Sequence, residues 1–406
     1  MKYISRTLET FFRAGNKQFP VLLVTGPRQT GKTTFLRYLA KESRTYITMD
    51  DPMLRSLAQD DPGLFFQRFK PPVLIDEIQY APQLLPYIKM AVDNDRTQGQ
   101  FWLAGSQKFH LMKGVSESLA GRVGILNLLG FSMRELEGDS SAAPFLPTPE
   151  KLAKRAISKT LLLPELFKKI WTGSFPALYQ SPPAEHDLFY SSYVETYLQR
   201  DVRALANVGN ESAFLKFLRA CAARTGQMLN MTDLCRDSDI NHETGKRWLS
   251  ILENSGIVLL LEPYHSNVNK RIVKTPKLYF LDSGLAAWLT SWSTPQTLEA
   301  GNMSGAFMET WVVSEIIKSW WHNGKNAPVY YYRDKDTKEI DLLLYENGML
   351  YPIEIKKTAN PSADVIRNFK TLKTLKTPIG PGCVISLAPV MIPLSETVTA
   401  VPVGML

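Results

Sequence analysis

Short apolar runs alternate with helical patterns along the first third of the chain. The runs that predict strands cover residues 21–24, 45–49, 73–75, 101–104 and 123–129, and each is followed by glycine or polar residues. Several are followed by segments with apolar residues at helical spacing. Strands that alternate with helices predict an α/β unit with a parallel, doubly wound sheet, whose ligand lies at the carboxyl ends of the strands.

The middle of the chain has a different pattern. Residues 140–150 are rich in Ser, Ala and Pro and predict a linker, and residues 161–225 predict a lid-like bundle of helices. Residues 244–254 predict a helix with one apolar face, followed by strands at 257–261 and 277–281. A helix, a turn, a second helix and a two-stranded wing together indicate a winged helix.

The carboxyl-terminal part predicts a helix followed by strands. The helix opens near Gly305, and residues 330–333, 339–345 and 349–355 are strand candidates. Residues 346–348, Glu-Asn-Gly, are typical of a hairpin turn, so the last two of these strands are expected to run antiparallel.

Length and charge set limits on the protein. A chain of 406 residues predicts two to four domains, and we expect them at 1–140, 155–225, 226–290 and 300–406. The net charge of +8 and the pI of about 9.1 fit nucleic acid or an acidic partner, although an ordinary solvated surface gives the same excess. Three distant cysteines and the lack of a stretch of ~20 apolar residues predict a soluble cytoplasmic protein with no membrane association.

One glycine-containing loop carries the strongest chemical signal. Residues 26–33 fit the pattern G-x-x-x-x-G-K-[ST] between a strand and a helix. The glycines let successive backbone N–H groups point at a phosphate, and the helix adds its positive N-terminal end. Lys32 is expected to reach the β- and γ-phosphates, and Thr33 to ligate Mg²⁺. The predicted nucleotide-binding residues are Gly26, Pro27, Arg28, Gln29, Thr30, Gly31, Lys32, Thr33 and Thr34. This loop predicts binding of ATP or GTP.

Two other strand ends carry candidate catalytic residues. Asp76 follows an apolar run and is expected to hold Mg²⁺ with Thr33, while the adjacent Glu77 is placed to polarise the attacking water. Ser106 and Gln107 follow the 101–104 strand and would lie beside the γ-phosphate if that strand lies between the first two. A plain Gly-Ser turn is the alternative for this pair.

Arg122 is a candidate for a group that acts on the transferring phosphate. It follows a helical segment and a glycine, directly before the last strand of the unit. An arginine at this place serves as a finger, in cis or from a neighbouring subunit. The alternative is a surface arginine that pairs with Glu117 or Glu135.

Five segments together resemble a known family. The sequences GPRQTGKTT, MDDP, VLIDEIQYAP, LAGSQ and SESLAGRV occur in this order. In this respect the chain resembles a widespread prokaryotic family of AAA+-type ATPases with a C-terminal domain of unknown function. The resemblance covers nearly the whole chain. It implies an ATPase core, a middle region with a winged helix, and a terminal domain similar to restriction-endonuclease folds.

Basic residues in the predicted winged helix are candidates for DNA contacts. They are Lys246, Arg247, Lys270, Arg271 and Lys274, of which the first two lie on the expected recognition helix and the others in the wing. Lysines and arginines at these places are expected to bind the major groove or phosphates. The alternative is that this face packs against protein, as in many winged helices linked to ATPases.

The carboxyl-terminal hairpin carries a second acidic cluster. A side-chain period of 2 places Glu354 and Lys356 on one face of their strand, and the hairpin brings Asp341 beside them. Glu309 on the preceding helix is the fourth member. Two acids and a lysine on adjacent strands are the constellation of PD-(D/E)XK nucleases, in which the acids bind Mg²⁺ or Mn²⁺. The alternative is an exposed hairpin whose charges pair with one another.

We therefore predict an ATP-hydrolysing protein of AAA+ type that acts on DNA as a motor or switch. The predicted partners are DNA and further copies of the chain. These copies are expected to form a homo-oligomer, for example a ring. Two alternatives remain open: a signalling or defence ATPase whose terminal domain binds a protein partner, and an ATP-gated, metal-dependent nuclease.

Overall fold

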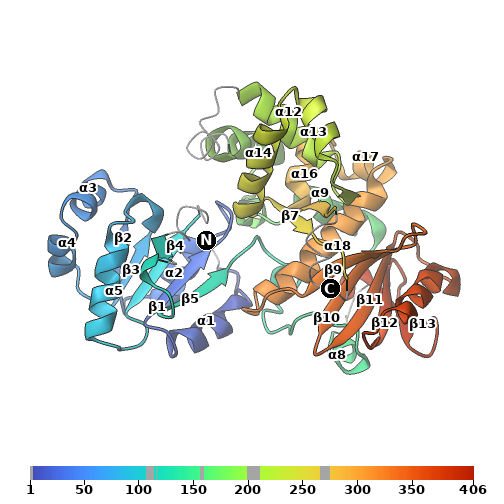
Figure 1. Cartoon of the computed structure of the whole chain (residues 1–406), viewed down its shortest axis with the longest axis horizontal. Helices are drawn as coiled ribbons and strands as arrows, with labels where there is room; N and C mark the ends of the chain where they lie inside the picture. Colours follow the sequence, from blue (N-terminus) through green and yellow to red (C-terminus); the bar gives the residue numbers. More distant parts are fainter. Residues whose placement is uncertain (1–2, 107–113, 116, 156–159, 199–210, 266–274) are drawn as a thin grey trace.

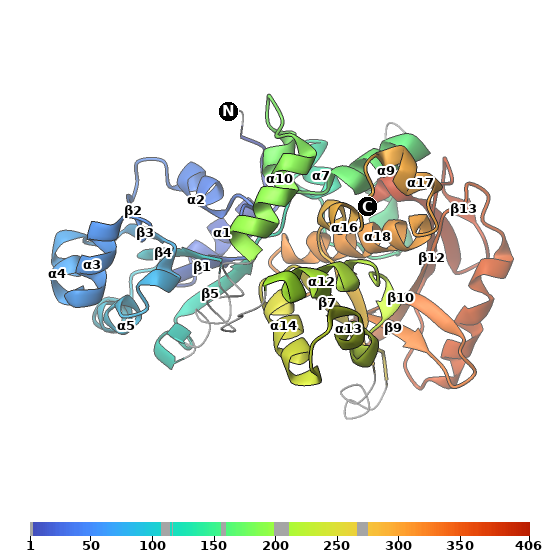
Figure 2. The ribbon, with the colours of Figure 1, turned by 90° about the horizontal axis from the view of Figure 1, so that it is seen from above.

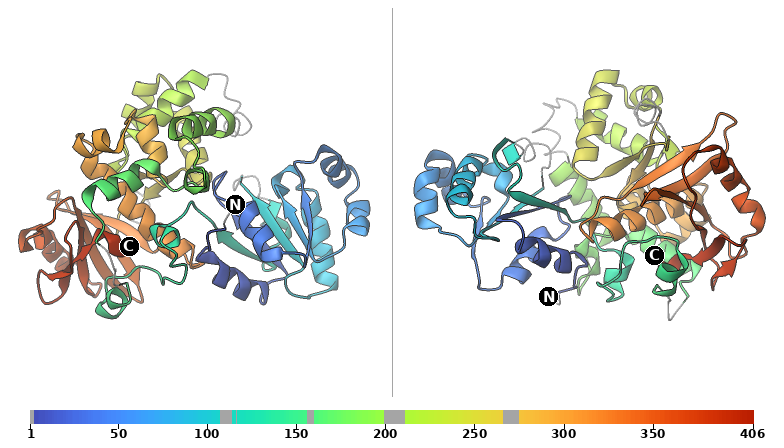
Figure 3. Two further views of the ribbon diagram at one scale, coloured as in Figure 1. Left: turned by 180° about the vertical axis from the view of Figure 1, so that it is seen from behind. Right: turned by 60° about the horizontal axis from the view of Figure 1, so that its bottom comes forward.

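The structure, a computed structural model, describes residues 3–106, 114–115, 117–155, 160–198, 211–265 and 275–406. Figure 1 shows the amino-terminal α/β unit at one side and the carboxyl-terminal sheet at the other, and Figure 3 shows the same separation from behind. Helices of the middle region and the long helix α18 (Ser304–Trp321) lie between the two sheets (Figure 2).

The amino-terminal unit is a five-stranded parallel sheet with helices on both faces. Its strands lie in the order β2-β3-β4-β1-β5, and every pairing is parallel. The elements of this unit are α1 (Leu8–Asn16), β1 (Val21–Thr25), α2 (Lys32–Ala40), β2 (Thr45–Thr48), α3 (Pro52–Asp60), α4 (Pro62–Arg68), β3 (Val73–Asp76), η1 (Ile78–Tyr80), α5 (Leu84–Asn94), β4 (Phe101–Gly105), β5 (Val123–Asn127) and α7 (Met133–Leu136). The predicted parallel, doubly wound sheet is confirmed.

Strand β1 shows why apolar runs without polar alternation form this sheet. All five of its residues are buried. Leu22 and Val24 pack in the core beneath α1 and α2, whereas Val21 and Leu23 pack in the core beneath α3, α4 and α5. Because both faces of the strand are covered, both sets of alternating side chains must be apolar.

The middle region is built from helices and a small antiparallel sheet, in the order β6-β8-β7. Its elements are α8 (Pro149–Ala153), α9 (Leu163–Thr172), η2 (Pro176–Tyr179), α10 (His186–Tyr193), the π-helical turn η3 (Val194–Leu198), α12 (Glu211–Ala222), β6 (Gln227–Met228), α13 (Met231–Ser238), α14 (His242–Asn254), β7 (Val258–Leu261), β8 (Lys277–Phe280), α16 (Ser283–Leu289) and α17 (Pro295–Ala300). Helix α14 and both longer strands lie where the sequence predicted them. The winged-helix assignment of this region stays a prediction.

The carboxyl-terminal part is a six-stranded mixed sheet in the order β13-β14-β12-β11-β10-β9. After α18 it contains β9 (Val329–Arg333), β10 (Glu339–Glu346), β11 (Met349–Lys356), η4 (Ala363–Thr374), β12 (Gly382–Ser386), β13 (Ile392–Pro393), β14 (Val398–Pro402) and η5 (Val403–Met405). Strands β10 and β11 form the predicted antiparallel hairpin. The restriction-endonuclease-like assignment stays a prediction.

The middle region and the carboxyl-terminal part share one continuous hydrophobic core. Phe217 and Trp248 from the middle helices belong to the same buried cluster as Val312 of α18 and Ile353 of β11. The predicted domains 226–290 and 300–406 therefore pack as one body around α18. Among the described helices, none is both long and apolar enough to cross a membrane.

Glu135 of the amino-terminal unit contacts this body and is paired with Arg6. The Arg6 guanidinium is buried and donates to the backbone oxygens of Thr30 at 3.1 Å and Leu129 at 2.7 Å. It also forms an ion pair with Glu135 at 3.2 Å, and the other oxygen of Glu135 lies 3.2 Å from Nδ1 of His322, just after α18. Burial alone would raise the pKa of Glu135, but Arg6 and His322 hold that pKa well below its ordinary value. A charged junction therefore connects the 26–33 loop, the exit from β5 and the end of α18.

Candidate functional site

The loop between β1 and α2 has the conformation that a phosphate cradle requires. Gly26 has a φ of 147° and Gly31 a φ of 88°, both in the region that favours glycine. A Cβ atom at Gly26 would lie 2.1 Å from the backbone oxygen of Leu128. The glycines of the predicted motif are therefore required by backbone conformation and, at Gly26, by the close approach of the segment that follows β5.

Lys32 lies curled into this loop. Its Nζ atom donates to the backbone oxygens of Gly26 at 3.0 Å and Pro27 at 2.6 Å, and the residue is buried. The Thr30 hydroxyl also donates to the Pro27 oxygen, at 3.0 Å, and Arg28 donates to the Tyr80 hydroxyl at 3.3 Å. The Lys32 ammonium group is thus held against the backbone of the loop by these two acceptors.

Thr33 and Asp76 form the pair that the sequence predicted for a metal. The Thr33 hydroxyl, on the first turn of α2, donates to Oδ2 of Asp76 at 2.7 Å, and the Glu77 amide donates to Oδ1 at 3.1 Å. A hydroxyl and a carboxylate are the hard oxygen ligands that Mg²⁺ prefers beside phosphates. These two oxygen ligands therefore fit a Mg²⁺ ion, which would neutralise phosphate charge when bound.

Glu77 is fixed directly after β3 in a strained conformation. Its φ and ψ of 54° and 40° are left-handed, a region that non-glycine residues rarely adopt and that is enriched at functional positions. Gln79 donates to Oε2 of Glu77, and the Ser106 hydroxyl lies 3.4 Å from the same oxygen. Gln79 lies within the segment VLIDEIQYAP, but the sequence predicted no role for it.

The predicted sensor strand has the position that its role requires. Strand β4 lies beside β1, on the side toward β2, and separates β1 from β3. Ser106 at its end reaches Glu77, as described above. Gln107 lies outside the described residues, so its sensor role stays a prediction.

Arg122 lies at the edge of the sheet opposite the 26–33 loop. The register of β5 pairs Val123 with Val21 and Asn127 with Thr25, so Arg122 precedes the amino end of β5 while the loop follows the carboxyl end of β1. Five strand residues separate the two edges by roughly 16 Å. This placement contradicts a finger in cis. Arg122 pairs with Asp93 of α5, at 2.6 and 3.1 Å, which corrects the expected partners Glu117 and Glu135.

The predicted DNA-contacting residues are described only in part. Lys246 and Arg247 are exposed on α14, and Trp248 and Leu249 on the same helix are buried, as the sequence predicted. Lys270, Arg271 and Lys274 lie outside the described residues. Two of the five cations are therefore placed on an accessible helix face.

Asp341, Glu354 and Lys356 of the predicted carboxyl-terminal cluster lie together, whereas Glu309 contacts Lys277 and Tyr279. Nζ of Lys356 lies 2.7 Å from Glu354 and 3.7 Å from Asp341, and the Ile355 amide donates to Asp341 at 2.8 Å. Burial and the nearby Asp341 raise the pKa of Glu309. No group of three His, Cys, Asp or Glu side chains is arranged to hold a metal ion anywhere in the described ranges. The arrangement favours internal charge pairing over the predicted second metal.

Lys277 is a member of this cluster that sequence reasoning missed. It lies buried on β8, with its Nζ 3.3 Å from Glu309 and 2.5 Å from Glu339. The Tyr279 hydroxyl donates to the same oxygen of Glu309 at 2.5 Å. Burial opposes the charged lysine, but the two carboxylates raise its pKa. The cluster therefore connects the middle sheet to α18 and β10, a link between distant segments that no local pattern signals.

Protonation of Glu354 yields a pH prediction. Burial, followed by the charge of Asp341, raises the pKa of this carboxyl from 4.5 to about 7. The folded protein thus binds this proton more tightly than the unfolded chain, so the stability that the proton contributes is full below about pH 4.5 and is lost as the pH rises through 7. The free energy of unfolding, measured with urea between pH 5 and 8, should decline less with rising pH in Glu354→Gln than in the parent. Parallel declines in both proteins would contradict the assignment.

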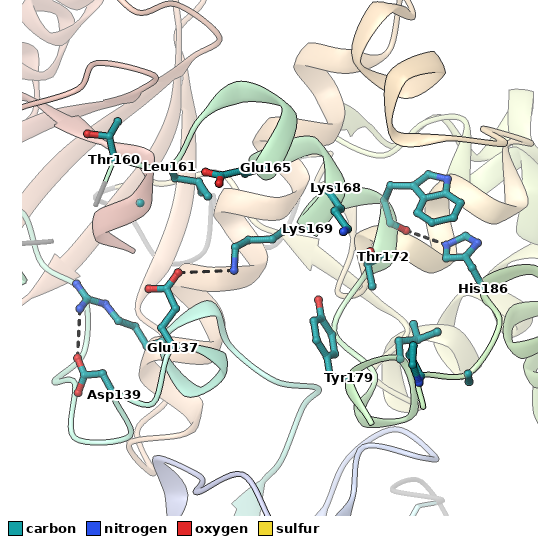
Figure 4. Close-up of a pocket in the computed structure, with 16 residues that line it drawn as sticks. Glu137, Asp139, Thr160, Leu161, Glu165, Lys168, Lys169, Thr172, Tyr179 and His186 are labelled. Carbon is teal, nitrogen blue, oxygen red and sulfur yellow. Dashed lines mark hydrogen bonds and ion pairs between the residues drawn. The ribbon is translucent and has the colours of Figure 1, made fainter. Parts of the chain in front are cut away.

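The cleft shown in Figure 4 lies where α7 and the segment after it meet α9 and η5, and it has a volume of about 950 Å³. Its charged groups oppose one another: Arg134 pairs with Asp139 at 3.2 Å and Lys169 with Glu137 at 3.6 Å. At one end the His186 ring stacks on Trp171. Because its basic and acidic side chains balance, the cleft has no charge excess that would attract phosphates.

The parallel sheet, the glycine loop and the Thr33–Asp76 pair define a P-loop NTPase-like domain. Residues 18–137 match the family model of an AAA domain, and this range contains the loop, Asp76 and Glu77. The match supports ATP binding and suggests ATP hydrolysis. Residues 163–296 and 304–406 match two further family models, DUF8612 and DUF4143, both described as domains of unknown function.

Similar proteins were found over most of the chain. The uncharacterized proteins Rv2008c of Mycobacterium tuberculosis and Mb2031c of Mycobacterium bovis are each 28% identical over 385 residues, which is 94% of this chain and 80% of theirs. Among solved structures, a Walker-type ATPase of Pyrococcus abyssi is 16% identical and covers 71% of this chain and 96% of its own, with a TM-score of 0.42. The RuvB Holliday junction branch migration motor of Thermotoga maritima is 19% identical over 63% of this chain and 86% of its own, with a TM-score of 0.27. At these scores the structural likenesses carry no functional conclusion.

Proposed function

We propose that the protein is a Mg²⁺-dependent ATPase that acts on DNA as a motor or switch. The observation that carries the ATPase part is the Thr33–Asp76 contact of 2.7 Å, with Glu77 fixed beside it. A hydroxyl on the phosphate helix, a metal-binding carboxylate and a candidate base meet at the carboxyl ends of β1 and β3. This is where an open α/β sheet binds its ligand.

Each residue of the site has a task in hydrolysis. The backbone N–H groups of the loop and the charge of Lys32 would bind the phosphates, while Thr33 and Asp76 would hold a Mg²⁺ ion that neutralises phosphate charge. The Glu77 carboxylate orients the attacking water and accepts its proton, and Ser106 and Gln79 hold that carboxylate in place. Hydrolysis then depends mainly on positioning and on neutralising phosphate charge.

Two observations support DNA as the partner. The chain has a net charge of +8, and α14 presents Lys246 and Arg247 on an exposed face in a region with the predicted order of winged-helix elements. Exposed cations on a helix that fits the major groove are the groups that bind DNA phosphates and bases.

Measuring ATP turnover with single-stranded, duplex and branched DNA tests this proposal. We expect Mg²⁺-dependent turnover that at least one DNA form stimulates. Lys32→Ala should lose about tenfold or more in ATP affinity, because the charge at the β- and γ-phosphates is removed. Turnover that no DNA form changes, together with salt-independent DNA binding, would favour the alternative of a protein partner.

We further propose that Arg122 acts on the ATP of a neighbouring subunit in a homo-oligomer. Its half-buried position at the far edge of the sheet, paired with Asp93, suits contact with a second copy and not with its own loop. Arg122→Ala should bind ATP and turn it over slowly, and mixing it with Lys32→Ala should restore activity that neither variant has alone. A mixture as inactive as its components would leave Arg122 a structural role only.

A further inference from the structure

Four side chains near the proposed metal position are linked by contacts that begin and end on α2. Thr33 and Arg37 lie four residues apart on α2, and therefore on the same face of that helix. Thr33 donates to Oδ2 of Asp76 at 2.7 Å, and the Tyr46 hydroxyl donates to the same oxygen at 3.1 Å. The Arg37 guanidinium lies over the Tyr46 ring, 4.8 Å from its centre. Tyr46 therefore contacts both Asp76 and helix α2.

The sheet register explains how Tyr46 reaches the metal-binding carboxylate. Strands β2 and β3 are parallel, with Tyr46 beside Leu74 and Thr48 beside Asp76. Leu74 packs in the core beneath α2, and the period of 2 places Leu74 and Asp76 on the same face of β3. The long phenol side chain thus extends along this face toward the carboxyl end of the sheet.

The Tyr46 ring is held from two sides, and its hydroxyl is a donor. The hydroxyl donates to Asp76, while the cation of Arg37 covers the ring face, an arrangement that attracts electrostatically. In this contact the phenol O–H is the donor and the carboxylate oxygen is the acceptor.

We propose that Tyr46 is a positioning residue for the metal-binding carboxylate of Asp76. This inference rests on the proposed use of Mg²⁺ by Thr33 and Asp76. When the Thr33 oxygen serves a metal, the contact between Thr33 and Asp76 changes, and the Tyr46 hydroxyl keeps Oδ2 in place. Partners that orient a metal ligand in this way contribute about 10–100-fold to metal affinity in other proteins.

A Mn²⁺ titration of the full chain with ADP bound tests the inference without relying on turnover. Electron paramagnetic resonance measures how much Mn²⁺ is bound at each step. Tyr46→Phe removes only the hydroxyl and should weaken Mn²⁺ binding by about tenfold or more. ADP affinity measured in EDTA should stay unchanged, because the phosphate loop is untouched. Tyr38→Phe is the matched control: Tyr38 is also an exposed tyrosine of this unit, but its ring stacks on Tyr3, and it should bind Mn²⁺ like the parent.

The outcomes separate the two proposals. Equal Mn²⁺ affinities for Tyr46→Phe and the parent would overturn the role of Tyr46 and leave the proposed ATPase site intact. A parent protein that adds nothing to the Mn²⁺ affinity of ADP alone would overturn the Mg²⁺ site itself, and the inference with it. A loss of ADP affinity in EDTA that accompanies Tyr46→Phe would show that Tyr46 supports the loop and not Asp76, which also contradicts the inference.

Discussion

Replacing Arg6 by methionine is expected to lower the free energy of unfolding by roughly 3–5 kcal/mol. The guanidinium is 3% exposed, and its removal leaves the buried carboxylate of Glu135 without its main counter-charge. It also removes the donors that reach the backbone oxygens of Thr30 and Leu129. Uncompensated buried charge and unpaired buried acceptors both cost more than the original pair contributes. Urea unfolding followed by tryptophan fluorescence measures the change.

Two further variants make this expectation specific. Arg122→Met removes an arginine whose pair with Asp93 is solvent-exposed, so it should change the stability little. Adding Glu135→Leu to Arg6→Met removes the orphaned charge and should recover part of the loss, because an apolar side chain needs no counter-ion. An equal loss for Arg6→Met and Arg122→Met would show that the buried junction contributes no more than a surface pair.

Glu77→Gln is expected to lower ATP turnover by about 10²–10⁴-fold while ATP affinity is retained. The amide keeps the shape of the side chain and its place beside Asp76, but it cannot accept the proton of the attacking water. Single-turnover hydrolysis and equilibrium binding of a fluorescent ATP analogue measure the two quantities separately.

An exposed glutamate of the same unit provides the control for this variant. Glu42→Gln makes the same chemical change in the turn after α2 and should leave turnover unchanged. If Glu77→Gln turns ATP over at the parent rate, another group accepts the proton. Glu77 would then have no part in proton transfer, despite its strained backbone and its contacts with Gln79 and Ser106.

Much of the candidate nucleotide site could be predicted from the chain because its signals are local. The loop at 26–33 needs glycine where φ is positive, and the apolar runs of β1 and β3 end at the residues proposed to bind phosphate and metal. The carboxyl-terminal hairpin was predictable for the same reason. A period of 2 and an Asn-Gly turn bring Asp341, Glu354 and Lys356 together without information from distant segments.

The partners of these groups were not predictable, since they come from segments far apart in the chain. Tyr46 meets Asp76 only because β2 and β3 are neighbours in register. Lys277 meets Glu309 because the middle sheet packs on α18. The far-edge position of Arg122 follows from the parallel direction of β5, which sequence spacing alone does not reveal.

The elements and the chemistry at each strand end could be derived from the chain alone, because backbone conformation, apolar periodicity and side-chain type are local properties. Which charges are buried together depends instead on how distant segments pack. Arg6, Glu135 and His322 are separated by more than a hundred residues at each step, yet they form one junction beneath the 26–33 loop. Long-range packing removes these groups from water, and a charge without water is stable only where another segment supplies its partner.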